Sequence, residues 1–192
     1  GILSFDQAVR LIHAPKVEAD WQAARDSLRF REAVLLQLQL AGRRAQLAVE
    51  SSEIRAPGEL TGSFDKLLPF EFTTGQREVV AAIESDLAAG TPMHRLLQGE
   101  VGSGKTVVAL RAMLTVSDSG GQSALLAPTE VLAAQHYRSI IETLGPQLTK
   151  ALGVKLLTGQ MPAAEKKKAL LDLVSGKCLL VVGTHALIAD RV

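Results

Sequence analysis

The sequence has a single cysteine, Cys178, among its 192 residues. One cysteine cannot form a disulfide within the chain, which excludes the small disulfide-stabilised secreted domains and fits a reducing compartment. The sequence also lacks an apolar run of the roughly 18 residues that a membrane-spanning helix needs. Its N-terminus lacks the basic and apolar blocks of a signal peptide. We therefore expect a cytoplasmic protein without a membrane partner.

An excess of charge of either sign is also absent. The 21 Lys and Arg residues nearly balance the 20 Asp and Glu residues, giving a net charge of +1. Composition therefore does not indicate a nucleic-acid-binding protein, and such a function has to be argued from motifs. The chain starts at Gly1 and ends at Val192 directly after a strand-like run, so we expect a piece of a longer protein.

Residues 1–60 are predicted to be helical and to form a separate segment. Ser4 lies three residues before Gln7, the spacing of a capping box, and Pro15 closes the short helix. A long amphipathic helix is predicted from about residue 21 to residue 49, because apolar residues recur there every three or four positions: Phe30, Val34, Leu38, Ala41, Ala45 and Ala48. The stretch "SSEIRAPGELTGS" is rich in turn formers and predicts a linker. We place the domain division there, with a second domain over residues 61–192.

Residues 61–192 have the pattern of an α/β fold, in which short apolar runs alternate with helices. Strands are expected at 95–98, 124–127, 155–157 and 179–182. Helices are expected at 105–116, 130–144 and 162–174, and another is marked by Val79, Ile83 and Leu87. This order predicts an open parallel sheet with helices on both faces, whose ligand lies at the carboxyl ends of the strands.

The stretch "LLQGEVGSGKTVVAL" matches the phosphate-loop pattern G-x-x-x-x-G-K-[ST]. Gly99, Gly104, Lys105 and Thr106 supply the defining positions, and Glu100, Val101, Gly102 and Ser103 complete the loop. Glycines let backbone N–H groups face phosphate oxygens, and the following helix adds its partial positive charge. Lys105 can reach the outer phosphates and the Thr106 hydroxyl can bind Mg²⁺. The alternative is a glycine turn with an exposed lysine.

Gln76 lies three residues after Thr73 in "LPFEFTTGQREVV". One interpretation is a capping box at the start of a helix. The other is that the Gln76 amide, which can donate and accept at once, holds the edge of an adenine. Both can hold in one structure.

Three of the expected strands end in small polar residues. Thr129 follows the first, Thr158 and Gly159 follow the second, and Thr184 and His185 follow the third. Thr129 is explained equally well as a helix N-cap. Alternatively, these strand ends contact a nucleic-acid backbone without reading its sequence. Cys178 is predicted to be a small core residue.

Four stretches, "LPFEFTTGQREVV", "PMHRLLQGEVGSGKTVVAL", "ALLAPTEVLAAQHY" and "VVGTHALI", together resemble the RecG family of superfamily-two bacterial DNA helicases. The N-terminal "LSFDQAVRLIHAP" and its long helix look like the segment that joins the family's DNA-binding wedge domain to its motor. The resemblance implies a RecA-like ATP-binding domain, ATP and Mg²⁺ as cofactors, and a monomeric enzyme that remodels stalled forks and Holliday junctions in recombination and repair.

The resemblance also assigns roles to residues. Lys105 and Thr106 would act in catalysis, with Thr106 as the Mg²⁺ ligand, while Gln76 and residues 99–106 would bind ATP. The DNA contacts would come from the strand ends: Thr129, Thr158, Gly159, Thr184 and His185.

The family's Asp-Glu-x-His element and its second motor domain do not occur in these 192 residues. We therefore expect an incomplete or rearranged sheet around the phosphate-loop strand, and no ATP turnover by this chain alone. Three other functions stay open: a small-molecule kinase or related phosphotransferase, a non-catalytic nucleotide-binding or interaction module, and a different superfamily-two motor.

Overall fold

The computed structural model describes residues 1–47 and 51–185. Two sequence expectations fall partly outside these residues, namely Ala48 in the long helix and the end of "VVGTHALI". The chain divides into two compact units, Gly1–Ser51 and Ser52–Val192. The division between residues 60 and 61 as the functional boundary stays a prediction. Within the described ranges, no helix is both long and apolar enough to cross a membrane.

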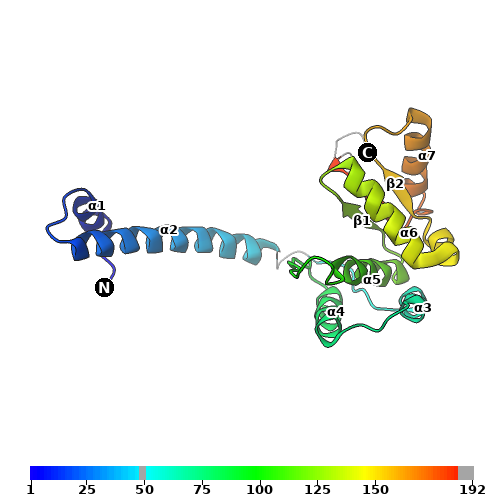
Figure 1. Ribbon diagram of the computed structural model, residues 1–192, viewed down its shortest axis with the longest axis horizontal. Helices are drawn as coiled ribbons and strands as arrows, with labels where there is room; N and C mark the ends of the chain where they lie inside the picture. Colours follow the sequence, from blue (N-terminus) through cyan, green and yellow to red (C-terminus); the bar gives the residue numbers. More distant parts are fainter. Residues whose placement is uncertain (48–50, 186–192) are drawn as a thin grey trace. The chain divides into compact units, whose positions relative to one another are not determined.

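The first unit is a hairpin of two helices, α1 (Phe5–His13) and α2 (Glu18–Leu47) (Figure 1). The predicted capping box of Ser4 and Gln7 is present at the start of α1. The two helices are joined through the backbone of Leu3, whose N–H donates to Ser27 Oγ at 3.0 Å and whose carbonyl accepts from Arg31 Nη2 at 2.9 Å. Long-range polar contacts thus supplement the burial of Ala8 against α2.

The second unit contains a parallel three-stranded sheet in the order β1-β3-β2. Its strands are β1 (Ser123–Leu126), β2 (Lys155–Leu157) and β3 (Leu180–Gly183). Helix α6 (Glu130–Leu152) connects β1 to β2, and α7 (Ala163–Val174) connects β2 to β3. Parallel strands need such crossovers, so the alternating pattern correctly predicted these three strands and their connections.

Helices cover both faces of this sheet, as the pattern predicted (Figure 1). Leu180 and Val182 of β3 belong to the main core cluster, which includes α6. Val181, which points the other way, packs in a second cluster with Ala169 of α7 and with Cys178. The predicted core position of Cys178 is confirmed, since it is fully buried. Burial raises the pKa of its thiol, which donates to the Leu180 carbonyl at 3.3 Å.

Helix α6 runs beyond the predicted end at residue 144. Its path is broken at Gly145, which has φ +68° and ψ 173°, and Pro146 follows. Gly145 tolerates this backbone conformation because it has no Cβ, and proline is well suited to the first turn of a helix. The Gly-Pro pair therefore separates two helical stretches instead of ending the helix.

Three further helices form the other part of the second unit: α3 (Glu59–Leu67), α4 (Thr74–Leu87) and α5 (Lys105–Asp118) (Figure 1). The linker expectation is wrong for α3. Its N-cap, Gly58, has no side chain to cap the helix. The cap comes instead from the carboxylate of Asp118, at the far end of α5, which accepts from the amides of Gly58, Leu60 and Thr61 at 2.7 to 3.0 Å.

The Asp118 cap explains why local composition missed α3. The acceptor is nearly sixty residues away in sequence, so no neighbouring residue signals it. Burial by itself would raise the pKa of Asp118, but hydrogen bonds from the Thr61 hydroxyl and from the three amides hold it below its usual value. Phe64 is fully buried and anchors the helix to the main core.

The strand expected at 95–98 is also wrong, because residues 92–100 form no strand. A single strand cannot satisfy its N–H and C=O groups without a neighbour. Within residues 1–47 and 51–185, the only sheet has three strands, and this segment is not among them. Leu96 is consequently 87% exposed. The prediction of an incomplete sheet is confirmed at this segment.

Candidate functional site

Residues 99–104 form a tight turn that leads directly into α5, whose first two residues are Lys105 and Thr106. Gly102 and Gly104 have φ values of +83° and +81°, in the left-handed region that favours glycine. Gly104 is the N-cap of α5. A Cβ at Gly99 would lie 2.7 Å from Ser103 Oγ, so a larger residue there would have to displace the Ser103 side chain. The sequence pattern and the backbone geometry agree on a phosphate-loop conformation.

Lys105 folds back over this loop. Its ammonium group donates to the carbonyls of Gly99 and Glu100, both at 2.7 Å. The lysine charge is therefore held at the mouth of the loop, within reach of groups that the loop would bind. Thr106 follows in the first turn of α5, where its side chain is exposed. The first N–H groups of a helix have no intrahelical acceptor and attract anions.

Gln76 joins the start of α4 to the phosphate loop. The side-chain Oε1 accepts from the Thr73 backbone N–H at 2.9 Å, and the Gln76 backbone N–H donates to Thr73 Oγ1. The side-chain Nε2 donates to the Ser103 carbonyl at 2.9 Å. The capping box is thus present, and the same side chain reaches the loop. A role in holding adenine stays a prediction.

A cleft of about 300 Å³ lies between α4 and the loop. It gathers Gln76 and Lys105, which the sequence predicted as ligand-binding residues, with apolar side chains beside them. The lining residues are Thr73, Gly75, Gln76, Val79, Leu97, Gln98, Gly99, Ser103, Lys105 and Val108.

The predicted DNA-contacting residues leave the sheet at one edge, which we call the strand-end edge (Thr129, Thr158, Gly159, Thr184 and His185). Leu126 of β1 and Leu157 of β2 both pair with Gly183 of β3, so all three strands end at the same level. Thr129 caps α6 by accepting from the Leu132 amide at 3.3 Å. The N-cap interpretation is therefore correct, and a second role in DNA binding stays a prediction.

The members of the strand-end edge differ in exposure. Thr129 and His185 are exposed and Thr184 is half-buried. Thr158 is only 7% exposed, and its amide donates to Met161 Sδ at 3.4 Å. The Thr158 hydroxyl is therefore poorly placed to contact a large ligand, and the exposed backbone of Gly159 is the more accessible group there.

Glu130 lies beside the strand-end edge, and the sequence did not reveal its tertiary role. Its Oε1 accepts from the Gln160 amide at 3.1 Å, and a Cβ at Gly159 would lie 3.1 Å from the same oxygen. Glu130 therefore holds the loop after β2 against the start of α6. Local sequence suggests only a favourable charge in the first turn of a helix, because its partner is thirty residues away.

The described residues offer no ready-made metal site of clustered side chains. Within residues 1–47 and 51–185, no three His, Cys, Asp or Glu residues are grouped closely enough to hold a metal ion.

The chain is similar to several known helicases. It is 49% identical, over its full length, to the ATP-dependent DNA helicase RecG of Mycobacterium leprae (strain TN), covering 27% of that protein. It is 42% identical to the ATP-dependent DNA helicase RecG of Synechocystis sp. (strain ATCC 27184 / PCC 6803 / Kazusa), covering 23% of it. The chain thus spans about a quarter of the length of these relatives.

A solved structure gives the same result in three dimensions. The "Structure of RecG bound to three-way DNA junction" superposes with a TM-score of 0.82 and 38% identity, covering 96% of this chain and 25% of that one. The family model described as "DEAD/DEAH box helicase" matches residues 73–192, a range that includes Gln76 and the phosphate loop. Because this match covers more than half of the sequence, the chain belongs to the DEAD/DEAH box helicase family.

Proposed function

We propose that this chain is the nucleotide-binding part of an ATP-dependent DNA helicase or translocase that remodels branched DNA. The main support is the phosphate loop at the start of α5, where Lys105 bridges two loop carbonyls at 2.7 Å. Further support comes from relatives named RecG, one of them bound to a three-way DNA junction. The whole protein would act as a monomer in DNA recombination and repair in the cytoplasm.

ATP and Mg²⁺ fit the residues of the loop. Gly102 and Gly104 adopt backbone angles that other residues rarely do. Such a turn can direct its N–H groups toward phosphate oxygens. Lys105 would exchange its two carbonyl acceptors for the outer phosphates, and Thr106 would offer its hydroxyl to Mg²⁺. When bound, the cation would neutralise charge on the phosphates during hydrolysis. Gln76 would turn its amide from Ser103 toward the adenine.

DNA would meet the strand-end edge. Thr129, Thr184 and the backbone near Gly159 can donate hydrogen bonds to phosphate oxygens, which would hold DNA of any sequence. ATP hydrolysis also needs a carboxylate that positions water and metal. The chain has no Asp-Glu pair in its sequence, so we propose that it binds ATP without turning it over by itself.

The test is Lys105→Ala in the intact protein. Loss of the lysine charge should reduce DNA-stimulated ATP hydrolysis by about a hundredfold or more, since electrostatic stabilisation of this kind is a large part of catalysis. Phosphate release with and without a three-way DNA junction measures the effect. Lys150→Ala, which removes an exposed lysine near the end of α6, is the matched control. Undiminished activity in Lys105→Ala would contradict the proposal.

A further inference from the structure

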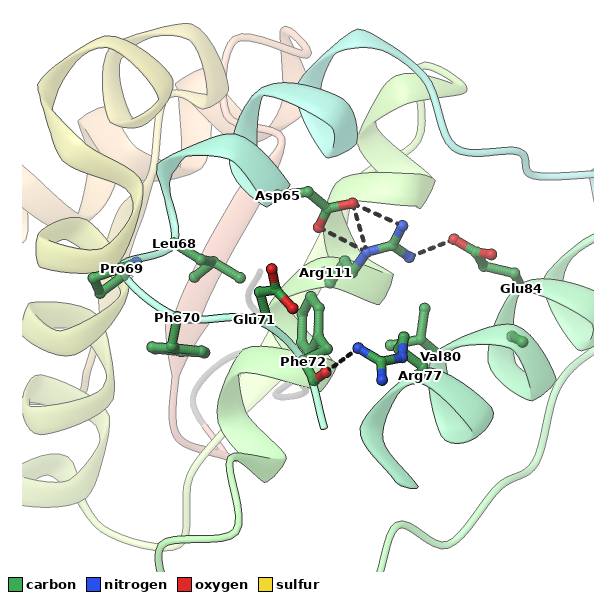
Figure 2. Close-up of a pocket in the computed structure, with 11 residues that line it drawn as sticks. Asp65, Leu68, Pro69, Phe70, Glu71, Phe72, Arg77, Val80, Glu84 and Arg111 are labelled. Carbon is green, nitrogen blue, oxygen red and sulfur yellow. Dashed lines mark hydrogen bonds and ion pairs between the residues drawn. The ribbon is translucent and has the colours of Figure 1, made fainter. Parts of the chain in front are cut away.

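Arg111 lies at the centre of the three-helix part of the second unit. It follows Lys105 by six residues on α5, and its guanidinium group lies between Asp65 of α3 and Glu84 of α4 (Figure 2). Nε is 2.9 Å from Asp65 Oδ1, Nη2 is 3.0 Å from Asp65 Oδ2, and Nη1 donates to Glu84 Oε1. One side chain therefore joins three helices.

The contacts at this position favour an arginine. Its side chain is only 13% exposed, so the charge needs partners. Burial by itself would lower the pKa of Arg111, but hydrogen bonds and attraction from Asp65 and Glu84 raise it. A planar guanidinium can donate to two carboxylates in different directions, which a lysine ammonium on a flexible chain does less well. Arg111 therefore stays charged and bridges both acids.

Arg111 borders a cavity of about 620 Å³ that also contains Phe70, Phe72 and Arg77 (Figure 2). The contacts of Arg111 do not favour binding of a molecule in that cavity, because each of the three guanidinium nitrogens already donates to a carboxylate. Arg77 is similarly directed to the Phe72 carbonyl. The bonds of Arg111 hold helices together and do not point at an open site.

Helix α4 is attached to the phosphate-loop helix at two points. Gln76, in its first turn, donates to the loop at Ser103, and Glu84, near its other end, accepts from Arg111. Gln76 and Glu84 are eight residues apart, about 12 Å along a helix axis. Two attachments at this separation restrain both sliding and rotation of α4 relative to α5. The position of Gln76 relative to Lys105 therefore depends on Arg111.

We infer that Arg111 is a positioning residue for nucleotide recognition, which sets the Gln76 amide relative to the phosphate loop through Glu84. The inference rests on the proposed function, in which Gln76 holds the base and the loop holds the phosphates. Loss of Arg111 should then weaken discrimination between bases while leaving phosphate binding intact. A purely structural role would weaken both together.

The experiment measures the affinity of the intact protein for ATP, GTP and inorganic tripolyphosphate. Arg111→Met should reduce the ratio of ATP affinity to GTP affinity by about two- to thirtyfold, the range expected for residues that act at a distance. Tripolyphosphate affinity should stay within about twofold of wild type, because α5 and its loop are retained. Arg111→Lys should give an intermediate ratio.

Two further variants keep the test informative if Arg111→Met folds poorly. Glu84→Ala removes the acceptor on α4 and should lower the ratio, whereas Asp65→Ala removes the acceptor on α3 and should lower it less. Lys155→Met is the matched control, since it breaks a 3.0 Å ion pair with Asp172 beside the sheet. Its affinity ratio should equal that of wild type.

The outcomes separate the inference from the proposed function. An unchanged ratio in Arg111→Met or Glu84→Ala, or an equal fall in affinity for all three probes, would overturn the inference while leaving the proposed function in place. If Lys105→Ala bound all three probes as tightly as the wild-type protein does, Lys105 would not hold phosphates. That result would overturn both the inference and the proposed function.

Discussion

The phosphate loop is held mainly by contacts between residues close in sequence, whereas the strand-end edge depends on contacts between residues far apart. In the loop, Lys105 bonds to carbonyls five and six residues away, and one longer contact comes from Gln76 Nε2 to the Ser103 carbonyl. Beside the edge, Glu130 bonds to an amide thirty residues away, and Leu126 pairs with Gly183 from another strand. The loop should therefore be most sensitive to changes in its own backbone. The edge should depend more on which groups the folded sheet leaves accessible.

After Lys105→Ala, the largest effect is expected from glycine substitutions in the loop. Gly102→Ala forces a left-handed conformation on alanine, which costs about 1–2 kcal/mol and should weaken ATP binding by about five- to thirtyfold. Gly104 has a similar φ of +81°. A Cβ there would meet only the flexible end of the Gln76 side chain at close range, so Gly104→Ala should weaken ATP binding by a similar factor. Wild-type affinity in both variants would show that backbone angles do not control the loop.

The second prediction tests whether the loop is as local as its contacts suggest. Asp118→Asn weakens the cap of α3 at the far end of α5, and should lower the free energy of unfolding by about 1–2 kcal/mol at pH 7. ATP affinity should stay within about twofold of wild type, because the loop contacts are retained. A large loss of ATP affinity would contradict the view that local contacts hold the loop, because ATP binding would then depend on a distant helix cap.

The same variant has a defined pH dependence. The pKa of Asp118 is lower in the folded chain than in the unfolded chain. Its contribution is therefore present at neutral pH, declines as the pH falls through the unfolded value of about 4, and is lost below the folded value. Urea unfolding at pH 7 and in acid should show the gap between wild type and Asp118→Asn closing. Asp6→Asn, at an exposed ion pair of α1, is the control.

The smallest effect is expected at the strand-end edge. Replacing Thr129 and Thr184 together by alanine should weaken DNA binding by about two- to tenfold, because a typical side-chain hydrogen bond contributes about 0.5–1.5 kcal/mol. The loss should be equal for DNA of different sequences, since phosphates carry no base information. Fluorescence anisotropy with two unrelated junction sequences measures it.

Thr158→Ala is the matched control for that prediction. Its side chain is only 7% exposed, so DNA affinity should not change. A stronger effect in Thr158→Ala than in the double variant, or a change in sequence preference, would contradict the proposed role of the exposed strand ends.

Much of the second unit could be predicted because its signals are local. The start of α5 at Lys105, the strand β2 and the capping box of Gln76 follow from glycine conformation, apolar runs and side chains that bond to nearby amides. The wrong predictions involve partners distant in sequence. Helix α3 depends on Asp118, and residues 95–98 have strand-like composition but no strand beside them in the described part of the chain. Composition could not reveal either fact.

The phosphate loop could be recognised from the amino-acid sequence alone, because the glycines at 102 and 104 fix its backbone and most of the bonds of Lys105 join residues a few positions apart. The tertiary structure decided which other groups accompany it. Pairing of β1, β2 and β3 brought the strand ends to one level, and Arg111 acquired its two carboxylates from separate helices. The physical reason is that hydrogen bonds and ion pairs between distant residues exist only after the chain has brought their helices and strands together.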